Sequence, residues 1–372
     1  MESILPFALG LALLIGGAEV LVRGASRLAL AFGISPLVVG LTVVSFGTSS
    51  PELAVSVQAA WNGQADVAIG NIVGSNVLNV LLILGLSALI VPLLVHRQLV
   101  RQEVPLMIGA SLLLFVFALD ASIGRVEGLV LFALLIVYTV FVVRQSRAGG
   151  RAAEVAEPVA HADGADGVED TRSEPRRWPV QVAMIVVGLA MLVQGSNLLV
   201  DAALVFARLL GVSETVIGLT IVALGTSLPE IATSVLAAIR GERDIAVGNV
   251  LGSNLFNILC VAGIASMVAP TGLTVAPSVL AFDLPVMIAV AALCLPIFFS
   301  GGVISRGEGA VFALGYVAYT TWLILAAAEH AALEGFSMTM LLFVLPLVVV
   351  RIVFVALREW RARHPPVPPA GR

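Results

Sequence analysis

The chain has 372 residues, of which 59% are hydrophobic and only 12% are charged, and its net charge is −4. Soluble domains carry about 25% charged residues, so this composition excludes an ordinary water-soluble enzyme. The mild net charge, without a basic patch, also excludes a typical nucleic-acid-binding protein. The two cysteines lie in apolar runs and offer no disulfide framework. The composition predicts a polytopic membrane protein, and nothing in it indicates a cofactor.

Apolar runs of about 20 residues, the length needed to cross a bilayer, recur along the chain. They predict helices at 3–30, 36–61, 67–92, 100–120, 126–144, 178–209, 214–240, 245–271, 276–299 and 308–327, with an eleventh at 337–357. The first run lacks both a basic N-terminal region and a small-residue cleavage pattern, so we interpret it as a membrane helix and not as a signal peptide. The predicted fold class is an all-α membrane protein.

Residues 147–177 separate two sets of five helices. They are rich in Ala, Gly and acidic residues, they lack the spacing of an EF-hand, and they have too few apolar residues to bury a core. We interpret them as a flexible acidic linker. The chain then divides into a first five-helix unit (1–146), the linker (147–177), a second five-helix unit (178–328) and a C-terminal part with the eleventh helix and an Arg-rich tail (329–372).

The arginines indicate an orientation. If the N-terminus lies outside and the chain crosses eleven times, 18 of the 20 Arg lie at the cytoplasmic side, and only Arg125 and Arg208 lie outside. Positive residues mark the cytoplasmic loops of membrane proteins. We therefore predict that the linker and the C-terminal tail are cytoplasmic.

The two five-helix units contain an internal repeat. Residues 40–92 superimpose on 218–270 at an offset of 178 residues, with 26 identities in 53 positions and no gap. Because five is an odd number of crossings, the second copy must run through the membrane in the opposite sense. Inverted-topology repeats are typical of transporters, in which the substrate site lies near the bilayer midplane between the halves.

The best-matched parts of the repeat are polar. The second and seventh helices each carry Gly-Thr-Ser-x-Pro-Glu, at residues 47–52 and 225–230. A proline inside a helix removes an N–H donor and clashes with the carbonyl four residues back, so both helices should break here and free backbone carbonyls. A cation would supply the missing partner. The helix-breaking residues are Gly47, Pro51, Gly225 and Pro229.

Glu52 and Glu230 place a carboxylate inside each of these apolar helices. A charge at the bilayer centre costs at least ~2.5 kcal/mol, so one such Glu could simply be protonated or paired with Arg. Two at equivalent positions, with no Arg in the core of the same helix, favour a cation site. Hard cations such as Na⁺ and Ca²⁺ bind carboxylate, carbonyl and hydroxyl oxygens, and no soft ligand lies nearby in the sequence.

The third and eighth helices carry Gly-Asn-x-x-Gly-Ser-Asn-x-x-Asn, at residues 70–79 and 248–257. The glycines form a small-xxx-small face that suits close helix packing. Amides are costly in lipid unless they meet a partner, and we expect Asn79 and Asn257 to line the site. The remaining amides could join helices to one another: Asn71, Asn76, Asn249 and Asn254.

Four other charged residues in or beside the predicted spans are expected to stabilise helices and not to bind ions. Asp66 and Asp244 precede apolar runs and are expected to be helix N-caps. Glu19 and Arg23 are four residues apart on one helix and are expected to form an ion pair.

These motifs resemble the cation/Ca²⁺ antiporter superfamily, and within it the prokaryotic Na⁺/Ca²⁺ exchangers. The resemblance covers helices one to ten, and it implies a prokaryotic inner membrane and a mobile gate formed by the first and sixth helices. It also implies that Glu52 and Glu230 are the central carboxylates. The further ligands that it implies are Thr48, Ser49, Thr226, Ser227, Ser75, Ser253 and the backbone carbonyls of Ser45 and Ala223.

Two positions bear on the choice of ion. Many prokaryotic and K⁺-dependent relatives carry Asp at the position of Asn257, so Asn here leaves a site of formal charge −2 and favours K⁺-independent exchange. Proton-coupled relatives typically carry Asn where Thr48 and Thr226 stand, so the threonines favour Na⁺ over H⁺.

The sequence therefore predicts a secondary antiporter, and not an enzyme, that exchanges Na⁺ for Ca²⁺ by alternating access. The two ions are transported substrates, and the lipid bilayer is the only other partner that we expect. An H⁺/Ca²⁺ or K⁺-dependent Na⁺/Ca²⁺ antiporter is the alternative within transport. A cation channel is a more remote one.

Overall fold

Helices make up nearly all of the structure, a computed structural model that describes residues 4–156, 178–209, 223–299, 302–344, 346 and 350. Helical turns of π type carry the label η. The first half contains α1 (Ile4–Phe32), α2 (Pro36–Val39), η1 (Gly40–Val44), α3 (Ser45–Thr48), α4 (Ser50–Trp61), α5 (Ala65–Leu78), η2 (Asn79–Leu84), α6 (Gly85–Ile90), β1 (Leu93–Leu94), η3 (Leu99–Glu103), α7 (Val104–Phe117), β2 (Ser122–Ile123) and α8 (Arg125–Ala156). The second half contains α9 (Trp178–Leu209), α11 (Ala223–Thr226), α12 (Leu228–Ile239), α13 (Arg243–Phe256), η6 (Asn257–Val261), α14 (Ala262–Val268), β3 (Leu273–Thr274), η7 (Val279–Asp283), α15 (Leu284–Phe299), β4 (Val303–Ile304), α16 (Arg306–Ala327), α17 (Ala332–Thr339) and η8 (Met340–Val344).

Eight helices within the described residues are long and apolar enough to cross a membrane, and the bent pair Pro36–Thr48 and Ser50–Trp61 makes up to nine. This confirms the predicted all-helical membrane fold. The predicted seventh helix, 214–240, is described from Ala223 onward. The predicted eleventh helix, 337–357, begins within α17 and η8, and most of the remainder lies outside the described residues.

The predicted fifth helix, 126–144, is longer in the structure, because α8 runs from Arg125 to Ala156 and enters the segment predicted to be the linker. The segment 147–156 reads Arg-Ala-Gly-Gly-Arg-Ala-Ala-Glu-Val-Ala. Ala, Arg and Glu are strong helix formers, so a lack of large apolar residues rules out a buried core but does not end a helix. The rest of the predicted linker, 157–177, lies outside the described residues.

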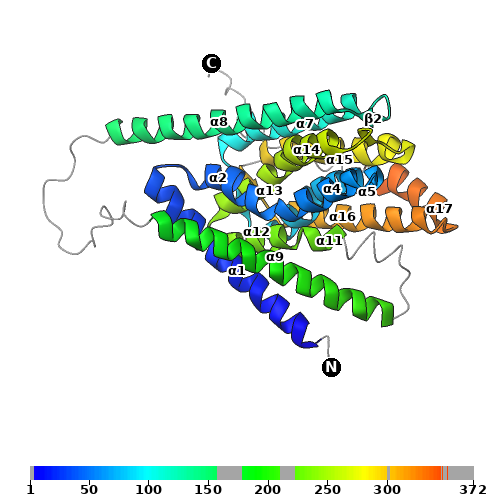
Figure 1. Cartoon of the computed structure of the whole chain (residues 1–372), viewed down its shortest axis with the longest axis horizontal. Coiled ribbons are helices and arrows are strands. Elements are labelled where there is room, and N and C mark those ends of the chain that lie inside the picture. The colour runs from blue at the N-terminus through cyan, green and yellow to red at the C-terminus, as the bar shows by residue number, and fades with distance from the viewer. Residues whose placement is uncertain are drawn as a thin grey trace, which may run out of the picture.

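Helices α1 and α9, the first helix of each half, pack along one another and cross one side of the molecule (Figure 1). Small residues allow the close approach: a Cβ added at Gly17 would lie 2.8 Å from the carbonyl oxygen of Gly188. In the same way, a Cβ at Gly195 would lie 2.8 Å from the carbonyl oxygen of Gly10. Packing of this kind replaces the hydrophobic effect as the source of helix association in lipid.

Short strands join the halves at two places. Strand β1 pairs antiparallel with β4, and β2 pairs antiparallel with β3. Each pair therefore takes one strand from each half. Strand β1 follows α6 and pairs with β4, which follows α15, and β2 follows α7 and pairs with β3, which follows α14. These two contacts fix the connectors that flank α7 and α15.

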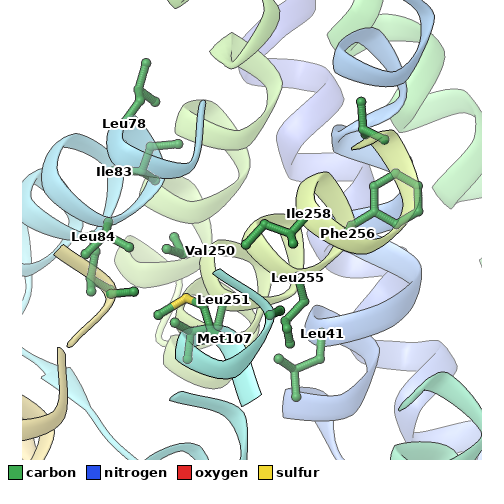
Figure 2. Close-up of a cluster of buried hydrophobic side chains, with 14 of the residues drawn as sticks. Leu41, Leu78, Ile83, Leu84, Met107, Val250, Leu251, Leu255, Phe256 and Ile258 are labelled. Atoms are coloured by element: carbon green, nitrogen blue, oxygen red, sulfur yellow. The ribbon is translucent and has the colours of Figure 1, made fainter. Parts of the chain in front are cut away.

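Apolar side chains fill the space between the central spans. Figure 2 shows buried residues of this cluster, among them Leu41 of η1, Met107 of α7 and Leu255 of α13. Here a Cβ at Gly252 would lie 2.6 Å from the carbonyl oxygen of Leu41. The glycine lets η1 and α13 touch, as the small-residue motif predicted for the second copy. The positions that correspond to η1 in the second half lie outside the described residues.

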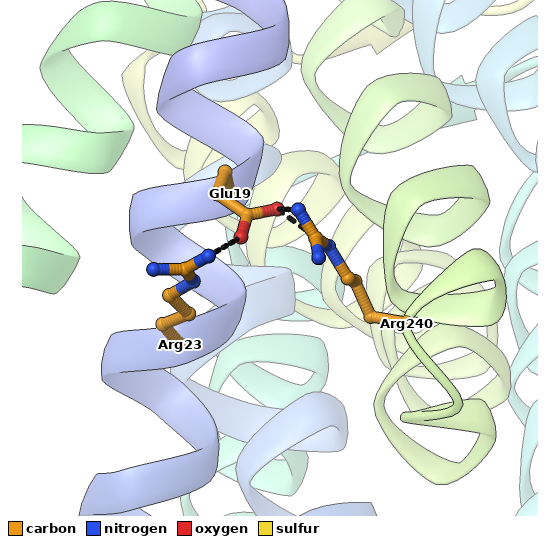
Figure 3. Close-up of polar contacts among 3 residues, drawn as sticks. All are labelled: Glu19, Arg23 and Arg240. Atoms are coloured by element: carbon orange, nitrogen blue, oxygen red, sulfur yellow. Dashed lines mark hydrogen bonds and ion pairs between the residues drawn. The ribbon is translucent and has the colours of Figure 1, made fainter.

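An ion pair links α1 to the turn after α12. Arg240 Nη2 and Glu19 Oε2 are 2.8 Å apart, and Glu19 also pairs with Arg23 on its own helix (Figure 3). The predicted pair of Glu19 with Arg23 is confirmed, and Arg240 was not foreseen. The same turn makes a second contact, because Ser26 Oγ donates to Glu242 Oε1 at 2.7 Å.

The N-cap prediction for two aspartates is wrong. Helix α5 begins at Ala65 after Gln64, so Asp66 lies within its first turn, and Asp244 lies within the first turn of α13. A carboxylate in the first turn still meets the positive end of the helix dipole. Asp244 Oδ2 also lies 3.4 Å from His96 Nε2.

Candidate cation-binding site

Each Gly-Thr-Ser-x-Pro-Glu motif interrupts a helix at its serine. In the first half α3 ends at Thr48 and α4 begins at Ser50, and the helical segments on the two sides of the break are bent by 46°. In the second half α11 ends at Thr226 and α12 begins at Leu228. The proline then falls in the first turn of the new helix, where an N–H would have no intrahelical partner. The breaks are therefore where the prolines predict them.

The two glutamates consequently lie in the first turns of α4 and α12, where backbone N–H groups favour negative charge. Glu52 and Glu230 are each 1% exposed. Ser49 Oγ donates to Glu230 Oε1 at 2.9 Å, and Ser227 Oγ donates to Glu52 Oε1 at 2.8 Å. The serine of each break thus bonds to the carboxylate of the other half, and this brings both motifs into one buried site.

The threonine before each break makes a second contact across the halves. Thr48 Oγ1 lies 3.1 Å from Asn249 Oδ1, and Thr226 Oγ1 lies 3.4 Å from Asn71 Oδ1. In both halves the asparagine nitrogen then donates to a serine hydroxyl 2.9 Å away. Helices α5 and α13 are therefore tied to the breaks by side-chain hydrogen bonds.

Two further asparagines begin π-type turns within the spans. Asn79 begins η2 and Asn257 begins η6, and each side chain is 1% exposed. Turns of this type are frequent at functional sites. Asn79 Nδ2 donates to Asn254 Oδ1 at 3.0 Å, and Asn254 Nδ2 lies 3.3 Å from Met107 Sδ. These bonds orient the Asn79 amide so that its oxygen faces away from Asn254.

The predicted site residues lie in the interior of the molecule. The side chains with an exposure of 4% or less are Glu52, Glu230, Thr48, Ser49, Ser227, Asn79, Asn257, Ser75, Ser253 and Ser45. Thr226 is half-buried, and Ala223 is the first residue of α11. Ser227 Oγ also lies 3.4 Å from Ser75 Oγ, which adds the third span to the network.

Several buried oxygens of this group have no hydrogen-bond partner among the described residues. They are Glu52 Oε2, Glu230 Oε2, Asn79 Oδ1, Asn257 Oδ1 and Ser253 Oγ. A buried polar atom without a partner costs about 1–3 kcal/mol. Carboxylate, amide and hydroxyl oxygens are the ligands of hard cations such as Na⁺ and Ca²⁺. The set could therefore hold such a cation.

One of the backbone carbonyls expected to be freed has a side-chain partner. Ser196 Oγ of α9 donates to the carbonyl oxygen of Gly225 at 2.5 Å, and this bond uses one of the two lone pairs of that oxygen. The repeat gave no sign of this contact, because the position equivalent to Ser196 is Ala18. A hydroxyl from the first helix of the second half thus supports the break in its own half.

Sequence analysis also missed Ser56 and Ser234, which accept the hydrogen bonds of Asn71 and Asn249. A signal was present, since both serines are identical at the repeat offset and follow the glutamates by one helical turn.

The prediction that four asparagines join helices is right for three of them. Asn76 is the exception, because its Nδ2 donates to a carbonyl of its own helix.

Comparison with known proteins agrees with this geometry. A model of the sodium/calcium exchanger protein family matches residues 2–144 and 180–325. The chain is 39% identical over 318 residues to CaxA of Alkalimonas amylolytica, covering 83% of this chain and 95% of that protein. It is 33% identical over 339 residues to the sodium/calcium exchanger MaX1 of Methanosarcina acetivorans, with 84% and 95% covered. A solved structure of the sodium-calcium exchanger NCX_Mj superimposes with a TM-score of 0.72 at 29% identity, over 86% of this chain and 98% of that one.

The fold is that of an all-helical, multi-pass membrane protein, and its likeness to NCX_Mj extends over nearly the whole of that exchanger. The matched family is one of transporters and not of catalytic enzymes. The chain belongs to the sodium/calcium exchanger protein family.

Proposed function

We propose that the protein exchanges Na⁺ for Ca²⁺ by alternating access, with Glu52 and Glu230 binding either ion in competition. Family membership supports cation/Ca²⁺ antiport with transported ions as the substrates. The observation that carries the assignment of residues is the crossed pair of serine–glutamate bonds. It joins two buried carboxylates that form no ion pair within the described part of the chain.

The remaining ligands in this proposal are those that the family resemblance implies. The proposed hydroxyl or backbone ligands are Thr48, Ser49, Thr226, Ser227, Ser75, Ser253, Ser45 and Ala223. The amide oxygens of Asn79 and Asn257 are buried without hydrogen-bond partners among the described residues, which supports their inclusion. Both are neutral, so the site carries a formal charge of −2.

Electrostatic competition accounts for the exchange. Two carboxylates neutralise one Ca²⁺, and Na⁺ ions can occupy the same oxygens instead, but a full set of both would leave excess positive charge. A loaded site can change its access from one side to the other. The empty site, with two uncompensated charges in a medium of low dielectric constant, crosses at a high cost. Ion binding thus decides which states can switch.

A flux measurement in reconstituted vesicles tests this function. An imposed Na⁺ gradient should drive radiolabelled Ca²⁺ across the membrane, and Glu52→Gln or Glu230→Gln should reduce that flux to background. Glu103→Gln is the matched control, because Glu103 is also buried in a span but bonds to Gln98 and Tyr138 instead of to the site. It should retain most of the flux.

Three results would contradict the proposal. Unchanged flux in both site variants would refute the assignment of the carboxylates. Ca²⁺ movement driven by a pH gradient in the absence of Na⁺ would indicate H⁺/Ca²⁺ antiport. Conductance far above the rate of a transporter, with no counter-ion required, would indicate a channel.

We further propose that the N-terminus lies outside a prokaryotic inner membrane, with the linker and the C-terminal tail in the cytoplasm. The distribution of Arg supports this orientation. The pairing of β1 with β4 and of β2 with β3 agrees with the alternate crossing that this proposal assumes, because the partners of each pair then lie on the same side of the membrane.

Thiol labelling of intact cells tests the orientation. The native Cys260 and Cys294 are buried and should give little background. An impermeant reagent should label Asp120→Cys from outside, and His96→Cys only after the membrane is permeabilised. The reverse pattern would show that the protein is inserted the other way.

A further inference from the structure

Each threonine near the carboxylates begins a chain of hydrogen bonds that leads through an asparagine to a serine. The first, here the Asn249 relay, runs from Thr48 through Asn249 to Ser234. Its distances are 3.1 Å between Thr48 Oγ1 and Asn249 Oδ1 and 2.9 Å between Asn249 Nδ2 and Ser234 Oγ. All three side chains are fully buried, with no exposed surface. A buried chain of this kind has fixed partners, because water cannot replace them.

The second chain, here the Asn71 relay, occupies the equivalent positions of the repeat. Thr226 Oγ1 lies 3.4 Å from Asn71 Oδ1, and Asn71 Nδ2 donates to Ser56 Oγ at 2.9 Å. Ser56 is fully buried, whereas Thr226 and Asn71 are half-buried. Neither family membership nor the resemblance assigns a role to the two serines.

The partners of Asn71 determine which way its amide points. Asn71 Nδ2 also donates to the backbone carbonyl oxygen of Glu52 at 3.3 Å. A carbonyl oxygen can only accept, so the nitrogen must face Glu52, and the amide oxygen must face the threonine. The oxygen of Asn71 is therefore an acceptor for the hydroxyl hydrogen of Thr226. The repeat gives Asn249 the same orientation toward Thr48.

Each threonine also lies close to a carboxylate. The serine that follows Thr48 bonds to Glu230, and the serine that follows Thr226 bonds to Glu52. A hydroxyl has one hydrogen and two lone pairs, so the carboxylate and the asparagine compete for that hydrogen. A cation on the carboxylate repels the hydrogen and attracts the lone pairs. The hydrogen must then turn to the asparagine oxygen before the threonine can act as a ligand.

We propose that Asn71 and Asn249 are positioning residues that accept the threonine hydrogens when Na⁺ binds, and that Ser56 and Ser234 hold them in place. The inference rests on the proposed function, because it takes the threonines as Na⁺ ligands. The relays set the affinity for Na⁺ through the orientation of a hydroxyl group, without touching the ion.

The test uses Ser234→Ala and Ser56→Ala in the purified full-length protein. Na⁺ binding is measured by the rise in melting temperature during a Na⁺ titration, since a ligand that binds the folded state stabilises it. Na⁺-driven Ca²⁺ flux is measured in vesicles. Loss of one neutral hydrogen bond should raise the Na⁺ concentration at half-saturation about 2- to 10-fold. The half-saturating Ca²⁺ concentration and the maximal rate should stay within about twofold of the parent values.

Two controls separate positioning from a structural role. Ser234→Thr keeps the hydroxyl and should restore the parent affinity for Na⁺. Ser111→Ala removes a buried hydroxyl that, among the described residues, bonds only to the backbone carbonyl oxygen of Met107 in its own helix, so it should change neither ion's affinity.

The outcomes distinguish this inference from the proposed function. If both alanine variants bind Na⁺ with the parent affinity, the proposed role of the relays is wrong. It is also wrong if the affinities for Na⁺ and Ca²⁺ change equally. If the parent protein shows no Na⁺-driven Ca²⁺ flux, the proposed function fails. The melting measurement then still decides whether the serines affect Na⁺ binding.

Discussion

The serine of each helix break contacts the carboxylate of the other half, so the first and second halves of the molecule make this contact in exchanged positions. Ser49 reaches Glu230 at 2.9 Å, and Ser227 reaches Glu52 at 2.8 Å. The Asn249 and Asn71 relays, which lie next to these serine–glutamate bonds, are also equivalent in the two halves. An ion that enters from either side of an alternating-access transporter must meet equivalent ligands, and a duplicated sequence provides them when both copies keep the same polar residues.

Away from the centre the halves differ in burial. Tyr138 donates to Glu103 at 2.7 Å in the first half, and Tyr319 donates to Asp283 at 2.9 Å in the second. The two pairs occupy corresponding helices, yet Glu103 is fully buried and also accepts from Gln98, whereas Asp283 is half-buried. The two copies therefore hold corresponding carboxylates in different environments.

The halves also differ in charge at their edges. Glu19 and Arg240 join α1 to the turn after α12, whereas the residues at the equivalent positions, Asn197 and Asn62, carry no charge. The ion pair therefore exists on one side only. The serine–glutamate and threonine–asparagine contacts are thus the same in both halves, while the ion pair between α1 and the turn after α12 is present in one of them.

The largest expected effect tests the unequal burial. Tyr138→Phe should lower the free energy of unfolding by about 1–3 kcal/mol, because it leaves a buried carboxylate oxygen without its donor. Tyr319→Phe should cost less than about 1 kcal/mol, because Asp283 is only half-buried in the protein. Thermal denaturation of the two purified variants in the same detergent measures the difference. Equal losses would show that burial does not distinguish the two pairs.

A smaller effect tests the one-sided ion pair. Exposed pairs contribute about 0.2–1 kcal/mol, and Arg240 is 53% exposed. If α1 slides as the family resemblance implies, Arg240→Gln should raise the maximal exchange rate by about 1.4- to 5-fold, because the pair must break for movement. Vesicle flux at low ionic strength measures this change.

Arg23→Gln is the matched control for that experiment. Arg23 pairs with Glu19 but belongs to the same helix, so it cannot hold α1 to another element. Its removal should leave the rate unchanged. An equal acceleration by both variants would attribute the effect to the charge of α1 and not to the link.

The sequence was sufficient for the eight long apolar helices of the described residues. Apolar runs predicted these helices, and the interruptions at Ser49 and Ser227 lie two residues before the prolines, because both effects depend on residues close together in the chain. The end of α8 could not be predicted in the same way. A helix that leaves the bilayer needs no apolar face, so composition did not reveal that α8 continues to Ala156.

The candidate site could be predicted only in part, because some of its features depend on single residues and others on contacts between distant segments. Glu52 and Glu230 stand out in the sequence because charge is rare in an apolar span. Which hydroxyl faces which carboxylate was not predictable, since Ser49 and Glu230 are 181 positions apart. Ser196, which bonds to Gly225, comes from a helix that the motif analysis did not connect to the break.

By itself, the sequence determined that the protein crosses a membrane many times, that it is built from two related halves, and that two matched carboxylates lie inside it. These properties follow from local hydrophobicity, the count of crossings and the cost of charge in lipid. Only the tertiary structure decided that the serines and threonines cross between the halves, and that an ion pair ties α1 on one side alone. Those contacts depend on how helices pack, which the order of residues along a single helix does not specify.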